Sequence, residues 1–135
     1  MLFHRILLIL TYLTLALARV YEISLPDHAV PGETIDVTVS AASHIMNWDD
    51  FGIIFGLIRE EHECDGCVGM ELGYISLYGN VTLGNTTYPV QIPDTTTGKY
   101  TFVAAVPYLV GISGETGINY FNQSINLVAN AKFRV

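Results

Sequence analysis

The chain has 135 residues, half of them hydrophobic, with six basic and thirteen acidic side chains and a formal net charge of −7. This length suits one domain, and it is sufficient to bury a hydrophobic core without many covalent cross-links. The acidic balance argues against binding nucleic acid or an anionic membrane through bulk electrostatics.

The first eighteen residues have the three zones of a secretory signal peptide. A basic start leads into the mostly apolar run Ile6–Ala18, and Ala16-Leu17-Ala18 supplies the small residues that a signal peptidase accepts. A membrane-spanning helix needs roughly 20 apolar residues, and this run ends at Arg19, so a membrane anchor is disfavoured. We therefore predict cleavage between Ala18 and Arg19 and secretion of the mature protein.

The predicted mature chain is one domain over residues 19–135. It keeps five basic and thirteen acidic side chains, because Arg5 is removed, and its net charge becomes −8. No internal repeat, linker or low-complexity tract divides it. We expect no membrane insertion after cleavage.

Apolar and polar residues alternate along most of this domain, a pattern typical of β-strands with one buried face. In chain order the expected strands are Val20–Leu25, Thr34–Ser40, Phe51–Ile58, Leu72–Tyr78, Tyr88–Ile92, Lys99–Val106 and Ile125–Val135. Turn signals separate them, among them Pro31-Gly32, Asp65-Gly66 and the segment from Gly114 to Gly117. The expected fold is all-β: a single-domain, two-sheet antiparallel β-sandwich of immunoglobulin-like kind.

The only two cysteines lie in Cys64-Asp65-Gly66-Cys67. In the oxidising secretory pathway this spacing favours a small local disulfide between Cys64 and Cys67, closed by a Gly-containing turn. A thiol redox site is an alternative, but the acidic neighbours disfavour the thiolate that such chemistry needs.

A metal site is the second alternative for this segment. His62 precedes the two cysteines, and Glu63 or His44 would complete a set of ligand types that zinc accepts. A second well-spaced ligand pair is missing, and disulfide formation would consume the thiols. We expect no metal and no cofactor.

Three sequons match the N-glycosylation signal. They are Asn80-Val-Thr82, Asn85-Thr-Thr87 and Asn122-Gln-Ser124. The first two lie in one polar, Gly-containing stretch where a loop is expected. We predict glycosylation at Asn80, Asn85 and Asn122.

No residue set predicts an enzyme. Gly111-Ile112-Ser113-Gly114 is followed by Glu115 where a nucleophile elbow requires a second Gly. Asp49-Asp50 is a carboxylate pair, but its position before a strand is typical of a turn. We expect no catalytic residues.

Two tyrosines offer a different kind of site. Tyr74 and Tyr78 share one face of a predicted strand with Ser76, and exposed aromatic rings in a row can stack on sugars. Packing in the core or at the edge of the sandwich is the simpler interpretation. The alternation alone does not decide which face is exposed.

The order of short landmarks along the chain resembles the fungal necrosis-inducing secreted protein family, of Nis type. The landmarks are Ile23-Ser-Leu-Pro26, Val30-Pro31-Gly32-x-x-Ile35-x-Val37, Ile54-Phe55-Gly56-Leu57, Leu72-Gly73, Val90-Gln-Ile92-Pro93, Gly98-Lys-Tyr100, Tyr108-Leu-Val-Gly111 and Asn119-Tyr120. The likeness covers nearly all of the predicted mature domain. Most landmarks are scaffold positions; Gly56, for example, lies mid-strand, where close packing against it is expected.

The resemblance implies a secreted effector of plant-associated fungi, and we expect the protein to be a monomer. Family members are described as suppressing pattern-triggered plant immunity by binding host receptor-associated protein kinases, and some induce cell death. An acidic, non-catalytic sandwich suits a basic patch on a kinase. Since the kinase domains lie inside the plant cell, translocation into the host cell is implied. The alternative function is an extracellular, wall-associated module that binds carbohydrate or protein.

Overall fold

The computed structural model describes residues 18–44 and 47–130. Residues 1–17 of the predicted signal peptide lie outside the described residues, as does the end of the last predicted strand, 131–135. Cleavage between Ala18 and Arg19 stays a prediction. No helix in the described part of the chain is long and apolar enough to cross a membrane.

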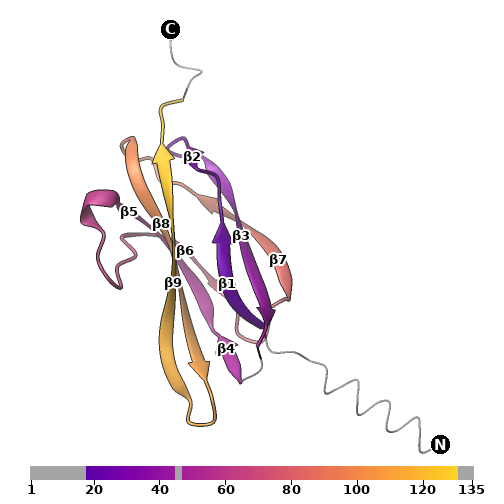
Figure 1. Cartoon of the computed structure of the whole chain (residues 1–135). Helices are drawn as coiled ribbons and strands as arrows, with labels where there is room; N and C mark the ends of the chain where they lie inside the picture. Colours follow the sequence, from indigo (N-terminus) through magenta and orange to yellow (C-terminus); the bar gives the residue numbers. More distant parts are fainter. Residues whose placement is uncertain (1–17, 45–46, 131–135) are drawn as a thin grey trace, which may run out of the picture.

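Two β-sheets face each other across the core (Figure 1). Sheet A has the order β1-β3-β7, formed by Ala18–Ser24, Thr34–Ser43 and Gly84–Gln91. Sheet B has the order β2-β9-β8-β5-β6, formed by His28–Ala29, Glu115–Leu127, Gly98–Val110, Gly52–Arg59 and Met70–Ser76. A short strand, β4 (Trp48–Asp50), also pairs with β8. The expected all-β, two-sheet sandwich is confirmed, with sheet B strongly curled.

The core fills the space between the sheets with alternate residues of the inner strands. Val37 on β3 and Phe102 on β8 are fully buried, and the rings of Phe55 and Phe102 lie 5.7 Å apart in a tilted arrangement. The alternation predicted for Thr34–Ser40 is therefore confirmed, because Ile35, Val37 and Val39 point inward. All strand pairs are antiparallel except the two-residue pair of β2 with β9.

The β8–β9 hairpin is much longer than predicted. β9 begins at Glu115, ten residues before the predicted start, and pairs with β8 over its whole length. The turn occupies residues 111–114, so Gly117, predicted as part of a turn, lies within the strand. Polar residues occupy both faces of this first half of β9, which removes the hydrophobic alternation that identifies strands.

Two other predictions about strands are wrong in detail. Strict alternation along the predicted strand Val20–Leu25 places Tyr21 on the same face as Ile23, but Tyr21 is 55% exposed while Val20 and Ile23 are buried. The pairing of β1 with β3 shifts between Val20 and Glu22, as in a β-bulge, and such an extra residue reverses the alternation. Asp49-Asp50, predicted as a turn, belongs to β4.

Candidate functional site

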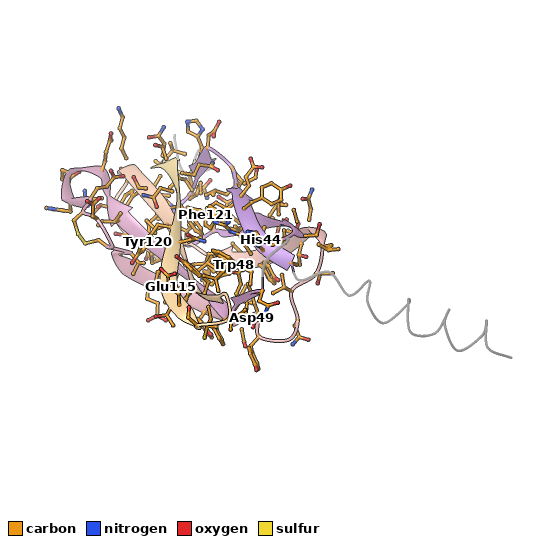
Figure 2. The ribbon with its side chains drawn as sticks, turned by 60° about the horizontal axis from the view of Figure 1, so that its bottom comes forward. His44, Trp48, Asp49, Glu115, Tyr120 and Phe121 are labelled. Carbon is orange, nitrogen blue, oxygen red and sulfur yellow. A yellow bond between two sulfur atoms is a disulfide. The ribbon has the colours of Figure 1, made fainter. Side chains whose placement is uncertain are left out.

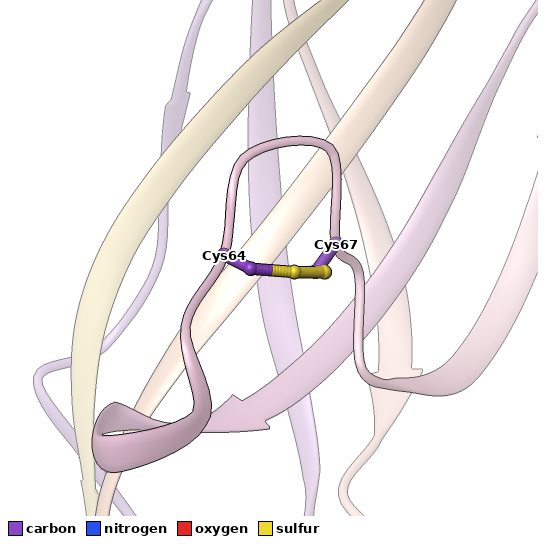
Figure 3. Close-up of a disulfide and its surroundings, with 2 residues drawn as sticks. All are labelled: Cys64 and Cys67. Carbon is purple, nitrogen blue, oxygen red and sulfur yellow. A yellow bond between two sulfur atoms is a disulfide. The ribbon is translucent and has the colours of Figure 1, made fainter.

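The loop between β5 and β6 carries the cysteines. It starts with a short 3₁₀ turn, η1 (Glu60–His62), and continues through the disulfide between Cys64 and Cys67 (Figure 3). The amide of Cys67 donates to the carbonyl of Cys64 at 3.1 Å, and Gly66 has φ +79°. This positive φ is the reason that a Gly is suited to the turn. We call residues 60–69 the disulfide loop.

The disulfide loop packs on the outer face of sheet B, the face turned away from sheet A. A Cβ atom at Gly56 of β5 would overlap with the carbonyl oxygen of Val68, so the loop backbone lies directly on this strand. The hydroxyl of Thr101 on β8 donates to the carboxylate of Glu63. The close packing expected at Gly56 is therefore found, and its partner is Val68.

This packing explains why β8 is buried on both faces. Tyr100, Phe102 and other even-numbered residues belong to the core between the sheets. Thr101, Val103 and Ala105 point the other way, yet each is at most 4% exposed. The disulfide loop and the side chains of neighbouring strands cover them.

The acidic groups of the loop face solvent. Glu60, Glu61 and Asp65 are exposed. One of them has a cationic partner: the guanidinium of Arg59 lies 3.8 Å from the carboxylate of Glu61, with both side chains well exposed. Such an exposed pair contributes little stability. The loop therefore combines a backbone fixed by packing with charges that remain available to a partner.

The metal set considered for this segment is not assembled. Cys64 and Cys67 are joined to each other, and Glu63 bonds Thr101. His44 lies against Trp48, with ring centroids 5.1 Å apart (Figure 2), and Trp48 pairs with the far end of β8. Among the described residues, no three His, Cys, Asp or Glu side chains are grouped as metal ligands.

The three predicted glycosylation sites occupy different surroundings, and all three side chains are exposed. Asn80 closes a turn: its backbone N–H donates to the backbone carbonyl of Leu77 at 2.8 Å. Asn85, expected in a loop, lies instead on β7, an edge strand of sheet A, and its side-chain oxygen accepts a hydrogen bond from Ser40 at 2.7 Å. Asn122 lies on β9, paired with Val103, next to the disulfide loop.

Tyr74 on β6 and Tyr78 in the loop that follows are exposed. The strand face that these two tyrosines were predicted to share is therefore the solvent-facing one. Tyr74 is 56% exposed and Tyr78 is 65% exposed. The ring of Tyr78 stacks on Phe51 at 5.4 Å and 4°, and the hydroxyl of Tyr74 donates to the Phe51 carbonyl at 3.4 Å. We call Phe51, Tyr74 and Tyr78 the aromatic cluster. Aromatic rings exposed in this way can stack on a sugar ring.

Asp50 is a buried acceptor at the end of sheet B. It is 1% exposed and accepts hydrogen bonds from the Val20 amide and the Trp48 indole, both at 2.7 Å. Burial raises the pKa of Asp50, an effect partly offset by these two hydrogen bonds and by the charge of Arg19. We call these four residues the Asp50 clamp. It links β1 of sheet A to β4 of sheet B.

An aromatic stack continues the clamp. Trp48 lies between the guanidinium of Arg19, 3.9 Å from its ring, and the ring of Tyr108, stacked at 4.3 Å. The sequence places Trp48 beside Asp49-Asp50, yet nothing in that spacing shows that β1 would approach them. The neighbouring Asp49 is exposed and does not share the role of Asp50 (Figure 2).

The chain matches the Nis1 family over residues 16–126. It is 28% identical over 116 residues to Necrosis-inducing secreted protein 1 of Colletotrichum higginsianum, covering 84% of this chain and 81% of that protein. The protein of the same name from Colletotrichum orbiculare is 27% identical over 117 residues, covering 84% and 72%.

Two solved structures have a distant similarity to this chain. A superoxide reductase (neelaredoxin) from Ignicoccus hospitalis superposes with a TM-score of 0.48 at 10% sequence identity, over 82% of each chain. A single-substitution variant of the same reductase gives the same values. A likeness at this level carries no argument about the present protein.

Proposed function

Because this chain belongs to the Nis1 family, we propose that it is a secreted fungal effector that can induce cell death in plant tissue. We further propose that it suppresses pattern-triggered immunity by binding receptor-associated protein kinases of the host, as a monomer and without catalysis. The observation that carries this proposal is the family match over residues 16–126, supported by two relatives named as necrosis-inducing secreted proteins.

The disulfide loop is the surface that we propose for the kinase contact. Glu60, Glu61 and Asp65 are exposed on a backbone that is fixed against sheet B. A backbone that is already fixed loses little conformational entropy when a partner binds, and complementary charges accelerate association and select the partner. The proposed partner surface is therefore a basic patch on the kinase domain.

The test is binding of the secreted protein, purified without its leader, to the cytoplasmic domain of a plant receptor kinase. We expect a complex that weakens as salt rises, together with reduced kinase output and reduced immune signalling in leaf tissue. Absence of binding to any of a panel of receptor-associated kinases, with immune signalling unchanged, would reject the proposal.

One observation favours a second candidate function, a wall-associated carbohydrate-binding module. Tyr74 and Tyr78 are both more than half exposed, and Tyr78 is backed by the stacked ring of Phe51. If the protein sediments with insoluble wall polysaccharide, and the double variant Tyr74→Ala, Tyr78→Ala does not, this second function is supported. Kinase binding that is unchanged in the same variant separates the two functions.

A further inference from the structure

A hollow lies between the disulfide loop and β9 on the outer face of sheet B. It has a volume of about 280 Å³, and its lining consists of Cys64, Asp65, Gly66, Cys67, Tyr120 and Asn122. The hollow thus joins the disulfide turn, at the border of the proposed kinase-binding surface, to a sequon that kinase binding does not explain.

One wall of this hollow is cross-linked, and the opposite wall is an aromatic side chain. The disulfide and the hydrogen bond from the Cys67 amide to the Cys64 carbonyl hold one wall. Tyr120 forms the opposite wall, and its hydroxyl oxygen lies 3.5 Å from the place that a Cβ atom would take at Gly66. Tyr120 is 41% exposed, so one part of its ring packs toward the loop and the rest faces solvent.

Asn122 lies at the rim of the hollow. It follows Tyr120 by two residues on β9, so both side chains project to the same outer face, whereas Phe121 between them packs against the core (Figure 2). The side chain of Asn122 is exposed, and Ser124, which completes the sequon, is exposed on the same face. Asn85, in contrast, lies on sheet A, where its side-chain oxygen accepts a hydrogen bond from the Ser40 hydroxyl.

We propose that Asn122 carries an N-linked glycan whose first sugars dock in this hollow, against Tyr120 and the disulfide turn. In the attachment step the amide nitrogen of Asn122 bonds to C1 of the first sugar of a lipid-linked oligosaccharide diphosphate. The bond from C1 to the diphosphate breaks, and one amide proton is lost as the lipid diphosphate leaves.

The chemistry of the hollow fits an N-acetylhexosamine. Such a ring has an apolar face, which packs on an aromatic ring, and a rim of hydroxyl and amide groups, which bond to backbone carbonyls. Tyr120 offers the ring, and the turn at Cys64–Cys67 offers the polar groups. The tether to Asn122 keeps the sugar at a high local concentration, so even a weak contact is occupied.

The test uses the full-length precursor secreted from a yeast, and it measures release of the Asn122 glycan by an endoglycosidase. Glycopeptide mass spectrometry follows this one site in the native and in the reduced, denatured protein. We expect Asn122 to be occupied and its glycan to be released up to about tenfold more slowly from the native protein, as one stacking contact allows.

Variants identify the contact. Tyr120→Ala should bring the native release rate to the denatured one, whereas Tyr120→Phe, which keeps the ring, should retain the protection. Tyr21→Ala removes a tyrosine of sheet A that is 55% exposed, more than Tyr120, and should leave the release rate of the Asn122 glycan unchanged. Near-ultraviolet circular dichroism confirms that each variant is folded. An unmodified Asn122, or a release rate that is independent of folding and of Tyr120, overturns the proposal.

Discussion

The Asp50 clamp and the disulfide loop use acidic residues in opposite ways. Asp50 is buried, and both of its oxygens accept hydrogen bonds that connect the two sheets. Glu60, Glu61 and Asp65 are exposed on a loop whose backbone is fixed by other contacts. A carboxylate of the first kind contributes to stability, while those of the second kind are free to contribute to binding. The substitutions below test this difference.

Removing the carboxylate of Asp50 should have the largest effect on stability. Asp50→Ala leaves the Val20 amide and the Trp48 indole without their acceptor. Each orphaned buried donor costs about 1–3 kcal/mol, so we expect the free energy of unfolding to fall by roughly 3–4 kcal/mol in urea denaturation. Asp49→Ala, the exposed neighbour, should change it by less than about 0.5 kcal/mol. Equal effects of the two substitutions would contradict the role of the clamp.

A methyl group at Gly56 should separate the disulfide loop from sheet B. Its Cβ atom would meet the backbone of Val68, which is not free to turn away as a side chain is. We expect Gly56→Ala to lower the free energy of unfolding by about 1–3 kcal/mol, the range for overpacking.

Gly73→Ala is the matched control, since nothing lies within 4 Å of a Cβ atom at that position of β6. It should be neutral or slightly stabilising, because replacing Gly in a strand lowers the entropy of the unfolded chain. If both glycine variants are equally stable, the loop does not rest on β5 as the structure has it.

The double variant Cys64→Ser, Cys67→Ser should lower the free energy of unfolding by an amount within the range given for Gly56→Ala. Its closed loop is short, with a sequence separation of 3, so the chain-entropy effect is about 2 kcal/mol. Thermal unfolding with and without a reductant checks this. The reductant should lower the thermal unfolding midpoint of the wild-type protein to that of the variant. It should leave the unfolding midpoint of the variant unchanged. A loss of stability much larger than this would show that the disulfide stabilises more of the protein than its own turn.

The smallest effect expected is a pH dependence that originates at Asp50. Because burial raises the pKa of Asp50 in the folded state, the folded protein binds its proton more tightly than the unfolded chain does. This contribution to stability is complete below the ordinary value of 3.8 and is lost as pH rises through the folded pKa. Urea denaturation at a series of pH values should show this slope in the wild type and not in Asp50→Asn. The opposite slope would contradict the assignment.

Local patterns predicted the strands that have one apolar face. Thr34–Ser40 alternates cleanly and forms most of β3, and Gly56 indicated close packing before its partner was known. The first half of β9 was missed because polar residues interrupt the apolar pattern on both faces, and its strand structure depends on pairing with β8. Local sequence does not contain that information.

The sites depend even more on contacts between distant segments. The cysteine spacing predicted a local disulfide, but not that the loop would reach Tyr120 or lie beside Asn122. Asp50 was interpreted as a turn residue, since its acceptor role depends on Val20, thirty residues earlier. The available sequence signal was an acidic residue close to a tryptophan. Those two residues alone do not predict that the acid is buried.

The most direct test is the affinity of the mature protein for a plant receptor-kinase cytoplasmic domain, compared with that of the triple variant Glu60→Gln, Glu61→Gln, Asp65→Asn. We predict at least a roughly tenfold weaker complex for the variant, mostly through slower association, with a free energy of unfolding within about 0.5 kcal/mol of the wild type. The wild-type affinity should fall with salt much more steeply than that of the variant. Equal affinity and equal salt dependence in two equally stable proteins would contradict the proposal that the disulfide loop is the kinase-binding surface.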